Sequence, residues 1–109
     1  MDELREQLMN NMIENLPVLR KKLKLSQEGL AGIIGVSRYT IMLIETHKRN
    51  MTWNMFLSLI LLFDKSAETA LLLRALNIYT DELDELIRAR PCAAVETDRA
   101  YSSSENKQR

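Results

Sequence analysis

The sequence predicts an all-α fold, a compact bundle of about five to six short helices. Leucine, isoleucine and methionine supply most of the apolar side chains, and the 109 residues include only three glycines and two prolines. This composition favours helices over sheets. No segment alternates apolar and polar residues in the way that is typical of a half-buried strand. In addition, serine or threonine precedes several segments whose apolar residues recur at helical spacing, as expected for N-caps.

The first expected element is an amphipathic arm or helix over residues 1–14, where apolar residues recur at helical spacing. Pro17 is unfavourable deep inside a helix but is common in the first turn of one. Asn15 can therefore cap a new helix, and we expect the N-terminal arm to be a separate or kinked element beside a domain formed by residues 15–90.

Two short helices joined by a tight turn are expected between residues 25 and 45. Ser26 can cap a helix that begins at Gln27, and Gly35 provides the flexible backbone that ends it. Ser37 can then cap a second helix, which packs against the first through apolar residues and leaves its opposite face free. This arrangement is a helix-turn-helix, and any functional surface would lie on the free face.

Three further helices are expected to begin after Thr52, Ser66 and Thr80. The helix after Thr52 is apolar on more than one side, so the two helices that follow it are expected to cover what the helix-turn-helix leaves exposed. Residues 91–109 are rich in small and polar residues and cannot build a core, which predicts a flexible tail.

Positive charge is concentrated in one part of this neutral chain. Residues 16–52 contain seven basic and two acidic residues, whereas residues 1–15 contain one basic and four acidic residues. A local basic surface of this kind attracts phosphate groups. For Lys21 and Lys22, solvated lysines at a helix end are an equally good interpretation.

Several classes of function are disfavoured by the residues that the chain lacks. The single cysteine, Cys92, excludes an internal disulfide and a cysteine-based zinc site, and no secretory signal is visible, so we expect a cytoplasmic protein. His47 has no partners at ligand spacing, so we expect no metal and no cofactor. The longest apolar run, residues 59–63, is too short to cross a membrane. Without a nucleophile and base pair or a glycine-rich phosphate loop, we expect no enzymatic activity.

Several motifs in register, from about residue 16 to residue 63, resemble the Xre/Cro-type, or lambda-repressor-like, family of helix-turn-helix DNA-binding domains. These motifs are Leu19-Arg20, Leu25-Ser26-Gln27-Glu28, Gly35-Val36-Ser37-Arg38, Ile44-Glu45 and Lys48-Arg49-Asn50. The resemblance implies that a recognition helix at about residues 38–45 enters the major groove of double-stranded DNA.

The resemblance also assigns roles to individual residues. The residues expected to bind DNA are Gln27, Ser37, Arg38, Tyr39, Thr40, Leu43, Lys48, Arg49 and Asn50. It further implies that Glu45 pairs with Arg20 and so supports the recognition helix. Lys24 and His47 stand where glycine is usual in the family, and Met42 and Leu43 are apolar where small polar or basic residues are more usual.

These observations lead to two hypotheses. The first is a sequence-specific transcriptional regulator, bacterial or phage-derived, that binds a palindromic operator as a homodimer. The alternative is a protein-interaction module of the antitoxin or anti-repressor type. It would bind its partner through the helix-turn-helix face at Met42 and Leu43, or through the N-terminal arm at Met12 and Ile13. Surplus apolar surface at Leu57 and Leu61 is explained equally well by a dimer interface and by cover from the C-terminal helices.

Overall fold

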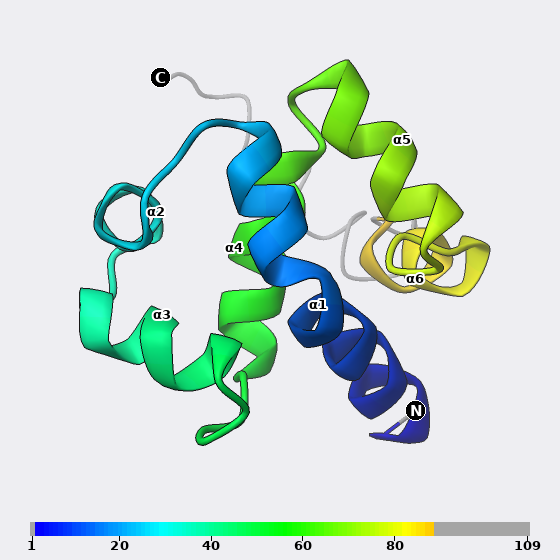
Figure 1. Cartoon of the computed structure of the whole chain (residues 1–109). Helices are drawn as coiled ribbons and strands as arrows, with labels where there is room; N and C mark the ends of the chain where they lie inside the picture. Colours follow the sequence, from blue (N-terminus) through cyan, green and yellow to red (C-terminus); the bar gives the residue numbers. More distant parts are fainter. Residues whose placement is uncertain (1, 89–109) are drawn as a thin grey trace, which may run out of the picture.

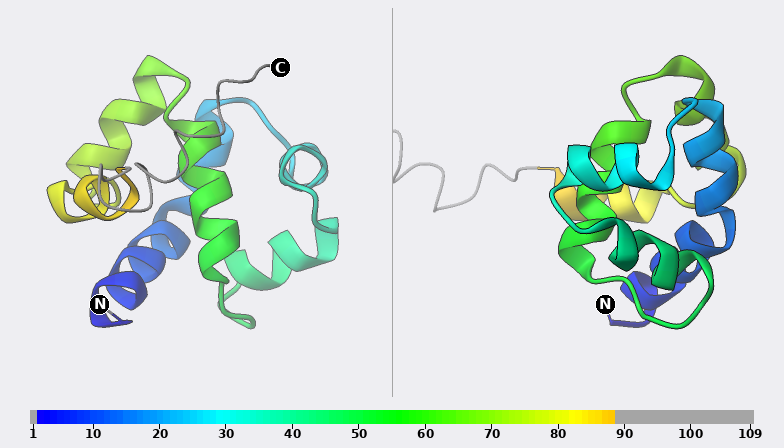
Figure 2. Two further views of the ribbon diagram at one scale, coloured as in Figure 1. Left: turned by 180° about the vertical axis from the view of Figure 1, so that it is seen from behind. Right: turned by 60° about the vertical axis from the view of Figure 1, so that its left-hand side comes forward.

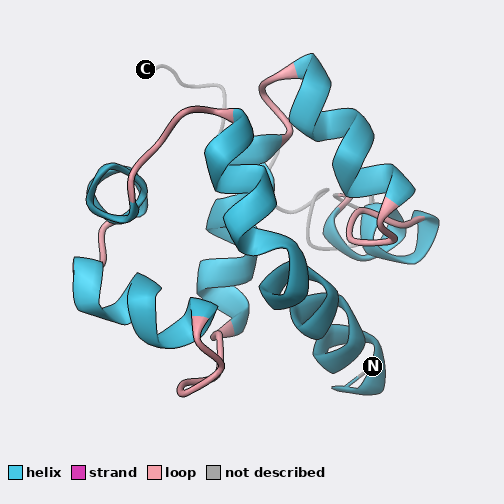
Figure 3. Cartoon of the chain, viewed as in Figure 1, coloured by secondary structure: helices cyan, strands magenta, loops and turns pink. Residues whose placement is uncertain are grey.

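The computed structural model describes residues 2–88, which form six helices and no strand (Figures 1 and 3). In chain order the helices are α1 (Asp2–Lys22), α2 (Gln27–Ile34), α3 (Arg38–Glu45), α4 (Trp53–Phe63), α5 (Ala67–Ala75) and α6 (Asp81–Ile87). The expected all-α fold is confirmed for this part of the chain. The tail expected over residues 91–109 lies outside the described residues. None of the described helices is long and apolar enough to cross a bilayer.

Of the two forms expected for the N-terminal arm, the structure has the kinked one, because α1 is one helix of 21 residues that includes Pro17 and no new helix begins after Asn15. Asn15 does not cap a helix; its side-chain amide donates to the carbonyl oxygen of Asn11 at 2.9 Å. Proline removes one backbone hydrogen bond, and the helix bends in its middle (Figure 1). Leu16 and Leu19 are fully buried on either side of Pro17, so tertiary packing holds the two halves in one element. Met12 and Ile13 are buried too, so the arm does not present them to a partner.

Four of the five serine and threonine caps that the sequence predicted are present. The side-chain oxygens of Ser26, Ser37, Thr52 and Thr80 each accept a hydrogen bond from a backbone N–H in the first turn of the following helix. Ser66 precedes α5 but makes no such side-chain bond. Each satisfied cap contributes about 1 kcal/mol and fixes the residue at which its helix begins.

The helices pack around α4, whose residues Phe56, Leu59 and Phe63 are fully buried. The α2–α3 pair lies on one side of α4, and α5 and α6 lie on the other (Figures 1 and 2). α1 packs against α3, α4 and α5 and so connects the two sides. The C-terminal helices cover α4 only in part, since Leu61 on α4 is two-thirds exposed.

A polar network attaches α6 to the rest of the bundle. The hydroxyl of Tyr79 donates to Asp84 at 2.8 Å, and Arg88 also bonds to this carboxylate. Hydrogen bonds from Arg88 and then from Tyr79 hold the pKa of Asp84 below its usual value. The Arg74 guanidinium lies 4.3 Å from the centre of the Tyr79 ring. We therefore assign Asp84 on α6 a structural role.

Three non-glycine residues near helix ends adopt left-handed backbone conformations, and one of them is Asn77 after α5, with φ of 60°. Lys24, after α1, has φ of 59°, and His47, after α3, has φ of 63°. At these two positions the Xre/Cro-type family, which the sequence resembles, usually has glycine. Side chains with a Cβ atom are strained in this region, so the departures from glycine carry a cost in stability.

We predict that Lys24→Gly raises the free energy of unfolding by about 0.5–1 kcal/mol, because relief of the left-handed strain outweighs the added flexibility of the unfolded chain. Urea unfolding followed by circular dichroism measures the change. Lys65→Gly is the matched control, since Lys65 also lies in a turn between helices but lacks a positive φ. The control should lose stability, and a gain of equal size in both variants would contradict the explanation.

Candidate functional site

The turn between α2 and α3 fixes the relative position of these two helices. Gly35 adopts a left-handed conformation with φ of 82°, and the N–H groups of Gly35 and Val36 both donate to the carbonyl oxygen of Ala31, at 2.9 and 3.0 Å. This pattern ends α2 within one residue. Ser37 then caps α3, so only three residues separate the last residue of α2 from the first residue of α3.

α3 is held by its inner face and exposes its outer face. Ile41 and Ile44 are fully buried against the core. Tyr39, on the opposite side of the helix, is 62% exposed. This amphipathic arrangement is the one that the sequence predicted for the second helix.

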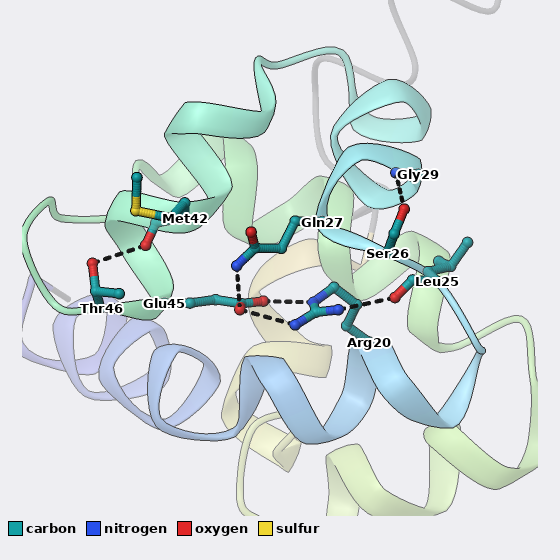
Figure 4. A network of polar contacts seen from close by, with 8 residues as sticks. All are labelled: Arg20, Leu25, Ser26, Gln27, Gly29, Met42, Glu45 and Thr46. Carbon is teal, nitrogen blue, oxygen red and sulfur yellow. Dashed lines mark hydrogen bonds and ion pairs between the residues drawn. The ribbon is translucent and has the colours of Figure 1, made fainter.

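An ion pair between α1 and α3 fixes the axial position of α3 (Figure 4). The Nε atom of Arg20 lies 2.8 Å from Oε2 of Glu45, and its Nη2 atom lies 3.1 Å from Oε1. The third nitrogen, Nη1, donates to the carbonyl oxygen of Leu25 at 3.0 Å. Only 11% of the Arg20 side chain and 6% of the Glu45 side chain are exposed. The pair implied by the family resemblance is therefore present. It is bidentate, and both side chains are largely shielded from solvent.

Gln27 takes part in the same network, which the sequence did not predict. Its side-chain amide donates to Oε1 of Glu45 at 3.0 Å (Figure 4). We expected this amide to reach a phosphate, but in the structure it ties the first turn of α2 to the last turn of α3. Glu45 thus receives hydrogen bonds from two different helices, α1 and α2.

The remaining residues predicted to bind DNA are grouped around the two ends of α3. Ser37, Arg38 and Tyr39 are exposed at its N-terminal end. The exposed loop that follows its C-terminal end contains the other three predicted polar residues, Lys48, Arg49 and Asn50.

A contact joins this loop to α3. The Nη1 atom of Arg49 donates to the hydroxyl of Thr40 at 3.3 Å, and that hydroxyl also lies 2.9 Å from the hydroxyl of Ser37. The structure therefore brings the loop cation beside the start of α3.

The charge exposed by residues 37–52 is positive only. Glu45 is the single acidic residue in this range, and it is buried and paired with Arg20. Arg38, Lys48 and Arg49 are exposed. The surface of α3 and its following loop therefore carries three cationic groups and no exposed carboxylate of its own.

Part of the basic region found in the sequence belongs elsewhere. Lys22 lies 3.3 Å from a carboxylate oxygen of Glu68 on α5, on the far side of α1 from α3. Lys21 and Lys22 occupy the last turn of α1, where positive charge stabilises the helix dipole. Of the two interpretations of these lysines, the structure favours charges at a helix end.

The proximity of α1 to the loop after α3 could not be predicted from the sequence. A cleft of about 290 Å³ separates them, with Asn10 and Glu14 of α1 on one wall and His47, Arg49 and Asn50 on the other. These residues are separated by more than 30 positions in the chain, and only the path of the bent α1 brings them together. Among the described residues, no cluster of three histidine, cysteine, aspartate or glutamate side chains is placed to hold a metal ion.

Comparison with known proteins adds no support for any particular function. The chain matches no family model, no curated protein and no solved structure. Functional inference therefore depends on the motifs of the sequence and on the geometry described above.

We predict a strong non-additivity between Arg20 and Glu45. Arg20→Met should lower the free energy of unfolding by about 3 kcal/mol, because it leaves a buried carboxylate without its cation. The double variant Arg20→Met/Glu45→Met should lose less than the sum of the two single variants. Urea unfolding of all four proteins measures the coupling.

The exposed Lys22–Glu68 pair provides the control for this cycle. Lys22→Met should change the free energy of unfolding by less than about 1 kcal/mol, as is usual for solvated ion pairs. If the Arg20 and Glu45 effects simply added, or if Lys22→Met cost as much as Arg20→Met, the ion pair would not fix α3.

Proposed function

We propose that this protein binds double-stranded DNA sequence-specifically and regulates transcription, with α3 lying in the major groove and α2 across the backbone. The observation that carries the proposal is the charge of residues 37–52, which expose three cations while their only carboxylate is buried. A helix with an exposed outer face and cations at both ends is complementary to the shape of a major groove and to the negative phosphates beside it. The resemblance to Xre/Cro-type domains supports the same proposal.

The proposed roles follow from where each cation lies. Arg38, in the first turn of α3, is placed to contact a guanine edge or an adjacent phosphate. Lys48, Arg49 and Asn50 lie in the loop beyond the helix, where phosphate contacts would position the protein without reading sequence. Gln27 contributes through Glu45, by holding α2 and α3 in register.

A homodimer on a palindromic operator is the second part of the proposal. An α3 of eight residues reads only a few base pairs, and twofold symmetry doubles that number. Leu57 and Leu61 line a mostly apolar cleft of about 440 Å³ between α4 and α6, and Leu61 is 66% exposed. The C-terminal helices do not cover this surface, which supports its use in dimer contacts.

The alternative function, a protein-interaction module, is favoured by one observation. Tyr39, Met42 and Leu43 give the outer face of α3 an apolar character, which is also typical of surfaces that bind other proteins. The exposed cations around that face support DNA binding over this alternative, because they would be unpaired against an apolar partner.

Selection of bound fragments from a random double-stranded DNA pool at low salt tests the proposal. Sequencing should reveal an enriched palindrome, and the affinity for the selected duplex should fall steeply as salt rises, because phosphate contacts release counterions. Absence of both enrichment and low-salt binding would reject DNA binding and leave the protein-interaction module. Enrichment of a single half-site would reject the dimer alone.

We predict different effects for two arginines on the selected duplex. Arg38→Ala should relax the sequence preference at one base position, with a loss of about 1–3 kcal/mol in binding. Arg49→Ala should weaken binding to all sequences alike and reduce the salt dependence by about one ion per protomer. Fluorescence anisotropy titrations at several salt concentrations measure both.

Lys22→Ala serves as the matched control, since Lys22 is an exposed cation outside residues 37–52 whose charge is paired with Glu68 on α5. It should leave both affinity and preference unchanged. The reverse pattern, with Arg49 setting the preference and Arg38 only the overall affinity, would refute the assigned roles.

A further inference from the structure

The hydroxyl groups at the start of α3 are already engaged within the protein. The Ser37 hydroxyl accepts a hydrogen bond from the backbone N–H of Thr40 at 3.1 Å and lies 2.9 Å from the Thr40 hydroxyl. The Thr40 hydroxyl also accepts from Arg49 at 3.3 Å. Reading a base edge through either hydroxyl would require breaking or sharing these contacts.

Two more polar side chains near α3 are engaged in the same way. The Gln27 amide donates to Glu45 at 3.0 Å. The Thr46 hydroxyl lies 2.8 Å from the carbonyl oxygen of Met42 and 3.2 Å from that of Leu43. These residues thus stabilise the helix pair, and they leave few free donors and acceptors for hydrogen bonds to bases.

The outer face of α3 is instead apolar at its centre. Tyr39, Met42 and Leu43 occupy positions i, i+3 and i+4, which share one face of a helix. This face lies opposite the buried Ile41 and Ile44. Tyr39 is largely exposed, and Met42 and Leu43 are each partly exposed.

Thymine is the base that presents an apolar group, its 5-methyl, in the major groove. If α3 enters that groove as proposed above, its apolar face meets the base edges. We propose that this protein recognises thymine methyl groups through Tyr39 and Leu43, so that its operator contains thymines at the centre of each half-site. This inference rests on the proposed DNA binding and adds the class of sequence that is read.

Replacement of thymine by uracil tests the inference without altering the protein. Uracil keeps the base pair and the charge and lacks only the methyl group. In the duplex obtained by selection, each thymine is replaced singly, and binding is measured by fluorescence anisotropy. At least one thymine in each half-site should give about fourfold weaker binding when replaced, the effect of losing one buried methyl.

A matched pair of leucine variants assigns the contact. With Leu43→Ala, replacement of the contacted thymine should no longer weaken binding, because the two changes remove the same contact. Leu71→Ala, at a leucine that is 70% exposed on α5, should leave the fourfold effect intact. Tyr39→Ala provides a second variant at a position so exposed that folding does not depend on it.

The outcomes separate this inference from the proposed function. A selected operator that lacks thymine, or replacements that all bind within twofold of the parent duplex, would overturn the inference while DNA binding stands. Failure to bind any DNA at low salt would overturn the proposed function and this inference with it, and the apolar face of α3 would then be a protein-binding surface.

Discussion

The ion pair between Arg20 and Glu45 is the interaction on which the arrangement of the α2–α3 pair depends. It connects the end of α1 to the end of α3, and Gln27 adds α2 to the same carboxylate. Since both charged groups are largely buried, each compensates a desolvation cost that the other would face alone. The pair also removes the only carboxylate of residues 37–52 from the surface. One contact therefore both positions α3 and leaves residues 37–52 without an exposed carboxylate.

Apolar burial and backbone conformation complete the support of α3. Ile41 and Ile44 fix the side of the helix that faces the core, and the left-handed Gly35 sets the angle at which the chain enters it. At the other end of α3, His47 has a strained, left-handed backbone conformation. The loop with Lys48 and Arg49 turns back beside α3 from this residue. Rigid support of this kind is what a surface needs to recognise a target with little loss of entropy on binding.

Local signals explain why most helices could be predicted from the sequence. Ser26, Ser37 and Thr52 bond to the backbone within three residues, so their effect does not depend on the rest of the fold. Whether the N-terminal arm is separate or kinked could not be predicted, because burial of residues on both sides of Pro17 outweighs a local preference. Nor could the bond from Gln27 to Glu45 or the proximity of Glu14 to Arg49, which arise only once distant helices pack together.

Chemical-shift mapping of the uniformly ¹⁵N-labelled protein with a DNA duplex at low salt would test most directly whether α3 and its loop form the DNA-binding surface. We predict that the amide signals that move are those of Arg38, Tyr39, Leu43 and residues 47–50, with α5 and α6 unaffected. Signals that do not move at all, or movement confined to the exposed apolar surface around Leu61, would contradict DNA recognition by α3.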